Sequence, residues 1–391
     1  MPRPLAFVVF IALVLSITAG MHAYVWLRLV RDAALPALWT RGLTVLFGLL
    51  FLSLPLTVVL SHSLPPDRGR LLLLCLFAWF GILFLLVMLC SVADLAQLGA
   101  RLVAMLGAHR PPRDPERRVV LARLIAGGVA LVAGGATVGG VRSALARVGV
   151  REVPVRLGRL PAALDGTTIV QLTDLHLGPT LRRDFVEEVV ATVNELAPDV
   201  VALTGDLADG TPDQLRSLVE PLRGLRARHG VYFVTGNHEY YSGVDAWCKE
   251  VARLGVRVLR NERVTIGTDD AGYELCGVDD FDAARRGGQG ADLARALAGR
   301  DPSRETVLLA HQPRAVHEAS AAGIGLVLSG HTHGGQIWPW GLFVRLQQPA
   351  VRGLHRFGNT QLYVSCGTGF WGPPLRLGAP AEITKIVLRA G

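Results

Sequence analysis

The chain has 391 residues, of which 50% are hydrophobic, so its composition fits both a large buried core and membrane-spanning segments. Its charges are distributed unevenly: residues 1–160 contain 17 Lys and Arg against 6 Asp and Glu, whereas residues 161–391 contain 23 against 26. The formal net charge of +8 therefore comes from the first part, where arginines flank apolar runs. A nucleic-acid-binding protein would carry its positive charge on the soluble part, so this distribution argues against nucleic acid as a partner.

Residues 1–150 are predicted to form a transmembrane region that precedes a soluble domain at residues 151–391. Three runs are nearly free of charge and close to the ~20 residues that cross a bilayer, and a fourth run is rich in Gly and Ala, which suits close helix packing in lipid. A signal peptide would explain the first run, but no clear cleavage site closes it and further runs follow. We therefore expect a bundle of about four transmembrane helices, at 4–27, 43–61, 71–93 and 124–141.

The arginines between these runs indicate the orientation of the chain in an inner or plasma membrane. Because cytoplasmic loops are enriched in Arg and Lys, the loop between the third and fourth runs is expected in the cytoplasm, which places the soluble domain on the outer, periplasmic or extracytoplasmic side. The arginines of that loop are Arg101, Arg110, Arg113, Arg117, Arg118 and Arg123. A second set follows the fourth run and argues for the opposite orientation: Arg142, Arg147, Arg151, Arg156 and Arg159.

From residue 167 onward, short β-branched runs alternate with helical stretches, which is typical of an α/β domain. Runs of apolar residues at 167–173, 200–205 and 231–236 predict buried strands between helix layers. The helix between the second and third of these strands is expected to end at His229 and Gly230, which would act as its C-terminal cap. Later strands are predicted at 275–278, 306–310, 325–330 and 362–366 and in the final ITKIVL.

Polar residues directly follow five of the predicted strands. The carboxyl ends of neighbouring strands open on one crevice, so these side chains are expected to lie close together. They are Asp174 and His176, Asp206 and Asp209, Asn237 and His238, His311, and His331 and His333. One such residue alone would more often be a cap or turn residue, but five of the eleven histidines occur in these motifs.

This residue set has the chemistry of a site for two metal ions. Oxygen and imidazole ligands without a thiolate suit manganese, iron or zinc, and argue against a structural zinc knot. Two such ions share a carboxylate and lower the pKa of a bound water, which suits the hydrolysis of phosphoesters. The five cysteines are scattered and are expected to pack in apolar surroundings.

Five sequence blocks together resemble the signature of the calcineurin-like metallophosphoesterases. In chain order they are DLH at 174–176, GDLAD at 205–209, GNHE at 236–239, His311 in AHQP, and GHTH at 330–333. The stretches GHTHGGQ and NHEYYSG are similar to the bacterial membrane-associated branch of that superfamily. The resemblance covers about residues 165–390 and implies a layered α/β/β/α domain.

The resemblance also implies roles for the individual residues. One metal ion would be held by Asp174, His176, Asp206 and His333. The second would be held by Asp206, Asn237, His311 and His331, so that Asp206 bridges the pair. A hydroxide shared by the two ions would attack phosphorus, while His238 would stabilise the phosphate and protonate the leaving alkoxide. Asp209 would orient the imidazole of His238.

The expected function is therefore a membrane-anchored, dimetal-dependent phosphodiesterase or phosphatase, and a lipid-linked phosphoester is one expected substrate. An alternative is the hydrolysis of a lipid-linked nucleotide pyrophosphate such as a UDP-diacylglucosamine. Another alternative is a non-catalytic metal-binding membrane receptor, although such a protein has no use for His238 and Asp209. A transporter is disfavoured because the apolar runs contain almost no ionisable residues.

Two further segments each have two interpretations. The tryptophans and phenylalanines of IWPWGLF at 337–343 and FWGPP at 370–374 either pack these loops onto the domain, or form an amphipathic lip at the depth of lipid headgroups. The stretch at 279–290 is expected to be a surface loop, and its Arg285 and Arg286 are either solvated or in contact with the substrate phosphate.

Overall fold

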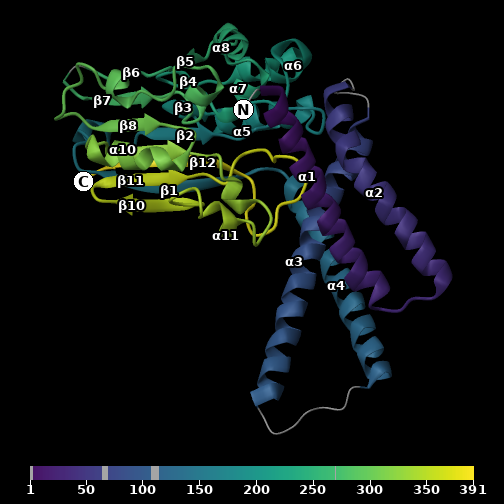
Figure 1. The fold of residues 1–391 in the computed structure, drawn as a ribbon. Coiled ribbons are helices and arrows are strands. Elements are labelled where there is room, and N and C mark those ends of the chain that lie inside the picture. Colours follow the sequence, from purple (N-terminus) through teal and green to yellow (C-terminus); the bar gives the residue numbers. More distant parts are fainter. Residues whose placement is uncertain (1–2, 64–68, 107–113, 269) are drawn as a thin grey trace. The chain divides into compact units, whose positions relative to one another are not determined.

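The computed structural model describes residues 3–63, 69–106, 114–268 and 270–391 (Figure 1). These residues form two compact units. One unit contains the N-terminal helices, including Leu72–Val141, together with Gly372–Pro374. The other contains Arg142–Trp371 and Leu375–Gly391. The first unit is helical, and the second contains all the described β-strands.

Four helices of the first unit are long and apolar enough to cross a membrane. They are α1 (Arg3–Trp26), which continues in the π-helical turn η1 (Leu27–Arg31), α2 (Ala37–Ser63), α3 (Arg70–Leu106) and α4 (Pro115–Leu145). The expectation of about four apolar helices is confirmed. Each helix extends beyond the predicted apolar run, because the flanking residues include strong helix formers such as Ala, Leu and Arg. Arg110 and Arg113, which contributed to the predicted orientation, lie outside the described residues.

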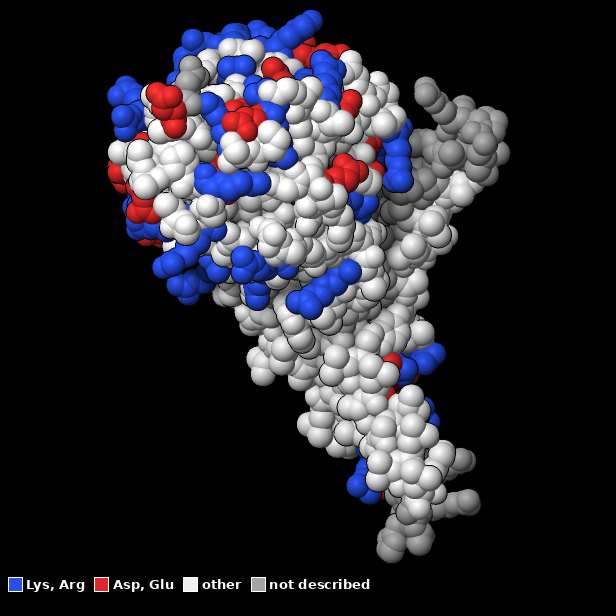
Figure 2. Space-filling view, turned by 90° about the vertical axis from the view of Figure 1, so that its left-hand side faces the viewer, with Lys and Arg blue, Asp and Glu red and all other residues white. Residues whose placement is uncertain are grey.

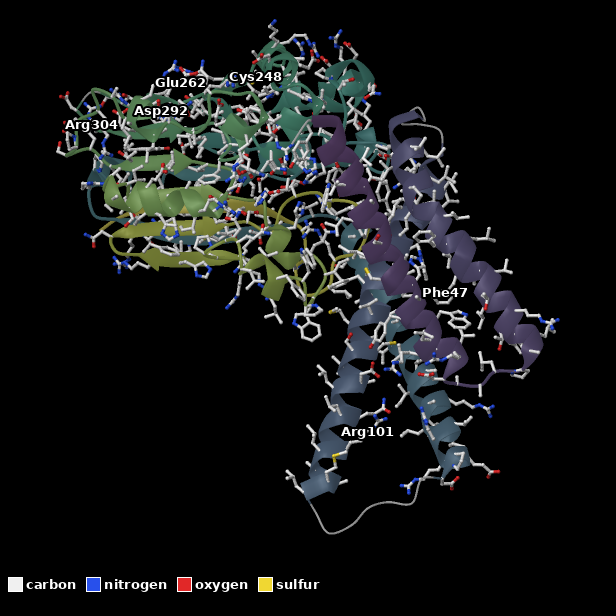
Figure 3. All side chains as sticks on the ribbon, in the orientation of Figure 1. Phe47, Arg101, Cys248, Glu262, Asp292 and Arg304 are labelled. Atoms are coloured by element: carbon white, nitrogen blue, oxygen red, sulfur yellow. The ribbon has the colours of Figure 1, made fainter. Side chains whose placement is uncertain are left out.

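A small apolar core holds these helices together, and it includes Val25, Leu54, Leu83 and Val129. The ring of Phe47 packs beside this core, with its centroid 6.1 Å from the ring of Trp79 (Figure 3). Many other apolar side chains of the helices are exposed, which is the pattern expected of residues that face lipid. In Figure 2 this part of the chain carries few charged side chains.

The second unit contains two six-stranded mixed sheets. The first has the strand order β1-β12-β2-β3-β4-β5, and the second has the order β10-β11-β9-β8-β7-β6. The strands of the first sheet are β1 (Gly149–Leu157), β2 (Thr168–Leu172), β3 (Val200–Thr204), β4 (Val231–Val234), β5 (Arg257–Val258) and β12 (Glu382–Ala390). Those of the second are β6 (Glu262–Gly267), β7 (Gly272–Gly277), β8 (Thr306–Leu309), β9 (Leu326–Ser329), β10 (Gly353–Phe357) and β11 (Thr360–Val364). Within them, β2, β3 and β4 are parallel, as are β7, β8, β9 and β11.

The two sheets share one core. Ile169 and Val234 of the first sheet belong to the same buried cluster as Leu275 and Leu328 of the second. The other face of the second sheet packs against α9 (Leu293–Ala296) and α10 (Val316–Ala321).

Helices also follow the central strands of the first sheet. Val170, Val201 and Phe233 point away from the shared core and are fully buried, which requires a helix layer on that side. The helices in question are α5 (Arg183–Glu195), α6 (Pro212–Val219), α7 (Asn237–Ser242) and α8 (Val244–Arg253). The predicted α/β/β/α layers are confirmed.

One local expectation fails for a physical reason, and one strand was not predicted. The helix that starts at Pro212 does not reach His229, because Pro221 lacks a backbone N–H and the chain continues only as a 3-10 turn, η3 (Glu220–Gly224). His229 lies instead in the turn before β4, and its carbonyl accepts a hydrogen bond from the Tyr232 hydroxyl at 2.7 Å. The sequence also did not indicate β1, whose first residues are exposed and carry no clear apolar pattern.

Candidate metal centre

The carboxyl ends of β2, β3, β4, β8 and β9 bring the predicted polar residues together. Three groups have potential ligand atoms that all lie within 4.8 Å of one another. The groups are Asp174 with His176 and His333, His176 with Asp206 and His238, and Asp206 with His311 and His331. The groups share members, so they form one continuous cluster rather than three separate sites. Both sheets contribute to it, since β2, β3 and β4 belong to the first sheet and β8 and β9 to the second.

The backbone is strained where it presents these side chains. Asp174, His176, Asp206, His331 and His333 all have φ angles between 44° and 68°. This left-handed region is uncommon for residues other than glycine, although Asp, Asn and His tolerate it best. Such strain persists where the surroundings fix it, and it concentrates at functional sites. Here it turns the chain sharply after each strand, so that the side chains point to a common centre.

A glycine precedes three of these turns because the strand-end loops approach each other closely. A Cβ atom on Gly236 would lie 2.2 Å from Oδ1 of Asp206, and one on Gly330 would lie 2.1 Å from Oδ2 of Asp174. A Cβ atom on Gly205 would lie 2.6 Å from the backbone nitrogen of Gly236. The glycines of GD, GN and GH therefore provide the space in which the carboxylates sit.

One part of the cluster lies around His176 and His333. Their Nε2 atoms are 3.0 Å apart, and both side chains are buried. Nε2 of His333 lies 3.4 Å from Oδ1 of Asp174, and Nε2 of His176 lies 3.7 Å from Oδ2 of Asp206. Four donor groups thus point into one small buried volume, as the first predicted ligand set requires.

The other part lies around His311 and His331. Nε2 of His311 is 3.1 Å from Oδ2 of Asp206 and 3.3 Å from Nδ1 of His331. Nδ1 of His311 donates a hydrogen bond to the carbonyl of Thr204 at 2.8 Å, which fixes the ring and directs Nε2 toward Asp206. Oδ2 of Asp206 therefore lies between the two parts of the cluster.

The donor set fits a pair of metal ions. The side-chain Oδ1 of Asn237 is buried and has no hydrogen-bond partner among the described residues. A buried amide oxygen without a partner is rare, and a cation would satisfy it. Carboxylate, amide and imidazole groups are the ligands that hard and borderline ions such as Mn, Fe and Zn accept.

The protonation of two of the candidate ligand histidines agrees with this fit, whereas Asp206 outweighs burial and raises the pKa of a third, His311, in the absence of an ion. Burial, together with the nearby His311, lowers the pKa of His331 to about 3, and burial beside His176 holds the pKa of His333 well below its usual range. Both rings are therefore neutral and have lone pairs available, as a metal ligand must. Burial acts against ionisation of Asp206 too, but the neighbouring His311 and His238 hold its pKa well below the usual range.

Asp209 serves two histidines at once. Its Oδ1 accepts hydrogen bonds from Nδ1 of His176 at 2.9 Å and from Nδ1 of His238 at 2.7 Å. His238 is the more accessible of the two, since 14% of its side chain is exposed against 1% for His176. Burial acts to lower the pKa of His238, but Asp206 and Asp209 outweigh burial and raise it to about 9 for the protein side chains alone. These two carboxylates therefore favour the protonated form of the His238 imidazole, which lies at the partly exposed edge of the cluster, here called the mouth.

Two buried residues that support the cluster were not singled out from the sequence. Glu239 accepts hydrogen bonds from the backbone N–H groups of Asp206, Leu207 and Gly236, at 2.7 to 3.1 Å. It therefore ties the loop after β3 to the loop after β4. Its place in GNHE was a signal, because an acidic residue at the third position of a helix commonly caps the helix start.

The second such residue is Arg376, which is almost fully buried. Its guanidinium donates hydrogen bonds to the carbonyls of Gly369 and Ala379 and lies 3.5 Å from Nδ1 of His333. Because it approaches from a distant loop with no motif around it, no local sequence pattern indicates its role.

The loop at 279–290 places its two arginines differently. The guanidinium of Arg286 stacks 4.0 Å from the ring centroid of Tyr241 and donates to its hydroxyl at 3.2 Å. The same hydroxyl accepts a hydrogen bond from Nδ2 of Asn237 at 3.2 Å. Arg285 pairs with Asp282 instead. Of the two candidates for a contact with substrate, only Arg286 is linked to the cluster among the described residues.

The aromatic side chains of the loop at 337–343 are exposed. Trp338 is 70% exposed, and Trp340 and Phe343 are also exposed. The interpretation that they pack the loop onto the domain is therefore wrong, and an exposed lip is what the structure contains.

Comparisons with known proteins agree with the geometry. Residues 167–335 match the family model described as calcineurin-like phosphoesterase. A transmembrane protein with metallophosphoesterase domain from Bos taurus is 40% identical over 328 residues, which cover 81% of this chain and 72% of that protein. The chain belongs to the calcineurin-like phosphoesterase family. It is thus a metal-dependent phosphoester hydrolase by class.

Two bacterial members of this family show how far the similarity extends. A metallophosphoesterase of Campylobacter jejuni is 30% identical over 385 residues, which cover 98% of this chain and 99% of that protein. A metallophosphoesterase of Helicobacter pylori is 42% identical over 251 residues, which cover 64% of this chain and 66% of that relative. With the Campylobacter protein, the similarity therefore includes the N-terminal helices as well as the phosphoesterase domain.

Proposed function

We propose that this chain is a membrane-anchored phosphodiesterase or phosphatase that works with two metal ions. The first would be held by Asp174, His176, Asp206 and His333. The second would be held by Asp206, Asn237, His311 and His331. The proposal rests on one observation. The two candidate ligand sets lie in one buried cluster and share Asp206, and the pair of His238 and Asp209, which belongs to neither set, lies beside them.

When bound, the metal pair supplies a water-derived nucleophile near neutral pH and neutralises charge on the phosphoryl oxygens. Side chains of the protein supply the acid and hold it in place. His238 donates its proton to the leaving oxygen, and Asp209 holds the His238 ring through the 2.7 Å hydrogen bond to Nδ1, which leaves Nε2 directed at the substrate. Because Asp209 also holds His176, one carboxylate fixes the distance between the acid and the first ligand set.

The same pair distinguishes an enzyme from a metal-binding receptor. A binding site needs only ligands, whereas His238 is partly exposed, protonated and hydrogen-bonded for orientation. These are the properties of a general acid. Its position supports turnover rather than storage or sensing of metal.

We further propose that the substrate is a lipid-linked phosphoester and that the phosphoesterase domain lies on the outer side of the inner or plasma membrane. The four apolar helices support a site close to a bilayer, where lipid-linked molecules are concentrated. Nucleic acid is not an expected substrate, because residues 161–391 carry more acidic than basic side chains.

The proposal is tested on the purified full-length chain and on His238→Ala, with His317→Ala on α10 as an exposed histidine control. Metal analysis should give two ions per chain in all three proteins. A panel of mono- and diesters should show a kcat for His238→Ala that is lower by about 10²–10⁴-fold, and an unchanged kcat for the control. A His238→Ala protein with wild-type kcat, or wild-type protein that is active after chelation, would contradict the proposal. Protease cleavage within 280–290 in sealed vesicles tests the side of the membrane.

A further inference from the structure

Six large apolar side chains near the cluster are exposed, and we refer to them as the lip. They are Trp338, Trp340, Leu342, Phe343, Leu346 and Trp371. Leu346 is 82% exposed and Trp338 is 70% exposed, so these residues contribute almost nothing to the core. Contiguous exposed apolar side chains on a folded domain mark an interaction surface.

Residues from two loops form the lip, and hydrogen bonds hold this part of the domain together. The side-chain amide of Gln336 donates to the carbonyl of Trp371 at 2.9 Å and accepts from its backbone N–H at 3.0 Å. The backbone N–H of Trp338 donates to the carbonyl of Leu377 at 3.0 Å, and the rings of Trp340 and Phe343 lie 5.4 Å apart. These bonds join the two loops that carry the exposed apolar side chains.

The lip starts at the catalytic cluster. Trp371 is exposed at one side, while its ring centroid lies 5.9 Å from that of His238, in an edge-on arrangement. The first loop of the lip, at 337–343, begins four residues after the candidate ligand His333. A surface that covers the lip therefore lies beside His238, at the mouth of the cluster.

The charge around the lip indicates what covers it. The sequence contains no Asp or Glu between Glu318 and Glu382, a stretch that includes the whole lip. The same stretch contains the exposed residues Arg345, Arg352 and Arg356. Tryptophan beside arginine, without acidic residues, is the composition that favours the headgroup region of an anionic membrane.

A short connection links the apolar helices to the domain that carries the lip. Helix α4 ends at Leu145 and β1 begins at Gly149, so residues 146–148 span at most about 11 Å at 3.3–3.6 Å per residue. Gly149 pairs with Glu382, the first residue of β12, and ten residues separate Trp371 of the lip from Glu382. The connection from the apolar helices therefore enters the domain at the strand end where the lip is also attached.

We propose that the lip docks on an anionic phospholipid surface and holds the mouth beside His238 at the depth of the headgroups. Aromatic rings and leucines would enter the interface between headgroups and acyl chains, and the three arginines would contact lipid phosphates. This proposal deepens the proposed function, because it explains how a lipid-linked phosphoester reaches the cluster, but docking itself is measurable without turnover.

The test uses the full-length chain in nanodiscs of phosphatidylcholine, with and without phosphatidylglycerol, and measures amide hydrogen exchange in residues 340–346. We expect exchange in this segment to be slower with phosphatidylglycerol, and the loop at 279–290 to exchange equally in both. In Arg345→Gln, the protection that phosphatidylglycerol adds should be about fivefold smaller than in wild type, since one basic residue near an anionic surface contributes about 1 kcal/mol. The variant Trp338→Ser/Leu342→Ser/Leu346→Ser should lose all of it, whereas the control Phe281→Ser, an exposed aromatic on another loop, should not.

Equal exchange in both lipids for wild-type protein would overturn the proposal. Protection that appears only when two chains share a nanodisc would also overturn it, because the lip would then be covered by a second copy. Because the lip side chains are exposed, the melting temperatures of the variants should match that of wild type, which separates loss of docking from loss of folding. Activity on a soluble diester reports separately on the metal cluster, so failure of docking and failure of the proposed function are distinguishable.

Discussion

Replacement of Gly236 by alanine should disable the cluster without touching a ligand. Gly236 has φ near −102°, a conformation that alanine adopts freely, so the substitution introduces no backbone strain. Its Cβ atom would lie 2.2 Å from Oδ1 of Asp206 and 2.4 Å from the Asp206 backbone nitrogen. The effect of the substitution is therefore purely steric, and it falls on the carboxylate that joins the two ligand sets.

The magnitude follows from the overlap. Ordinary contact of a Cβ atom begins at 3.4 Å, so the loops after β3 and β4 must separate by about 1.2 Å, the difference between 3.4 and 2.2 Å. Overpacking of a close-packed region costs about 1–3 kcal/mol. For a domain of this size, that loss of stability corresponds to a fall in Tm of about 2–12 °C. A displacement of about 1 Å in a catalytic array lowers kcat by about 10²-fold.

The assay compares Gly236→Ala with Gly158→Ala, a position where a Cβ atom meets nothing within 4 Å among the described residues. Bound metal, Tm and diesterase kcat are measured on both full-length proteins. We expect Gly158→Ala to match wild type on all three, and Gly236→Ala to lose metal, stability and activity together. If Gly236→Ala keeps both ions and its kcat, then the close approach of the two loops does not set the position of Asp206, and the reasoning is refuted.

Three further predictions concern groups around the cluster. Glu239→Gln should lower the free energy of unfolding by about 1–3 kcal/mol in urea titration, because one amide oxygen cannot accept three backbone N–H groups; an unchanged midpoint would contradict this. Arg286→Ala should raise KM about tenfold at constant kcat, the effect of one charge-assisted hydrogen bond of about 1.5 kcal/mol, whereas Arg285→Ala should leave KM unaltered; a wild-type KM for Arg286→Ala would show that Arg286 does not bind substrate. Removal of metal by a chelator should abolish turnover and lower stability by about 4 kcal/mol for each ion that was present at 1,000 times its Kd, with recovery on addition of Mn²⁺; a chelated protein with wild-type Tm would exclude a metal-stabilised fold.

Much of the fold could be predicted from the sequence because its strands are short, apolar and rich in β-branched residues. The same feature located the cluster: where an apolar run stops at Asp174, Asp206 or His331, the polar residue must lie at a strand end. Parallel strands then determine that these ends meet at one edge. Local pattern and simple topology were sufficient for these residues.

The sequence was insufficient where a residue acts over a long separation or where burial is decided by tertiary packing. Arg376 reaches His333 from another loop, and nothing near it in the chain marks it as part of the site. The tryptophans at 338 and 340 fit both a buried and an exposed loop, since periodicity says nothing of aromatic residues in irregular segments. The helix expected to reach His229 ends at Val219, because Pro221 lacks the backbone N–H that would continue it.

The cluster draws its ligands from both sheets, and this origin links metal affinity to the architecture of the whole domain. Neither sheet alone carries all the candidate ligands, so binding of the proposed ions would stabilise the packing of the two sheets against each other. The bound pair would act as a clamp across the seam between the sheets, at the end where the strands finish. Substitutions in the shared core that shift the strand ends of one sheet relative to the other should therefore weaken metal retention, although they touch no candidate ligand.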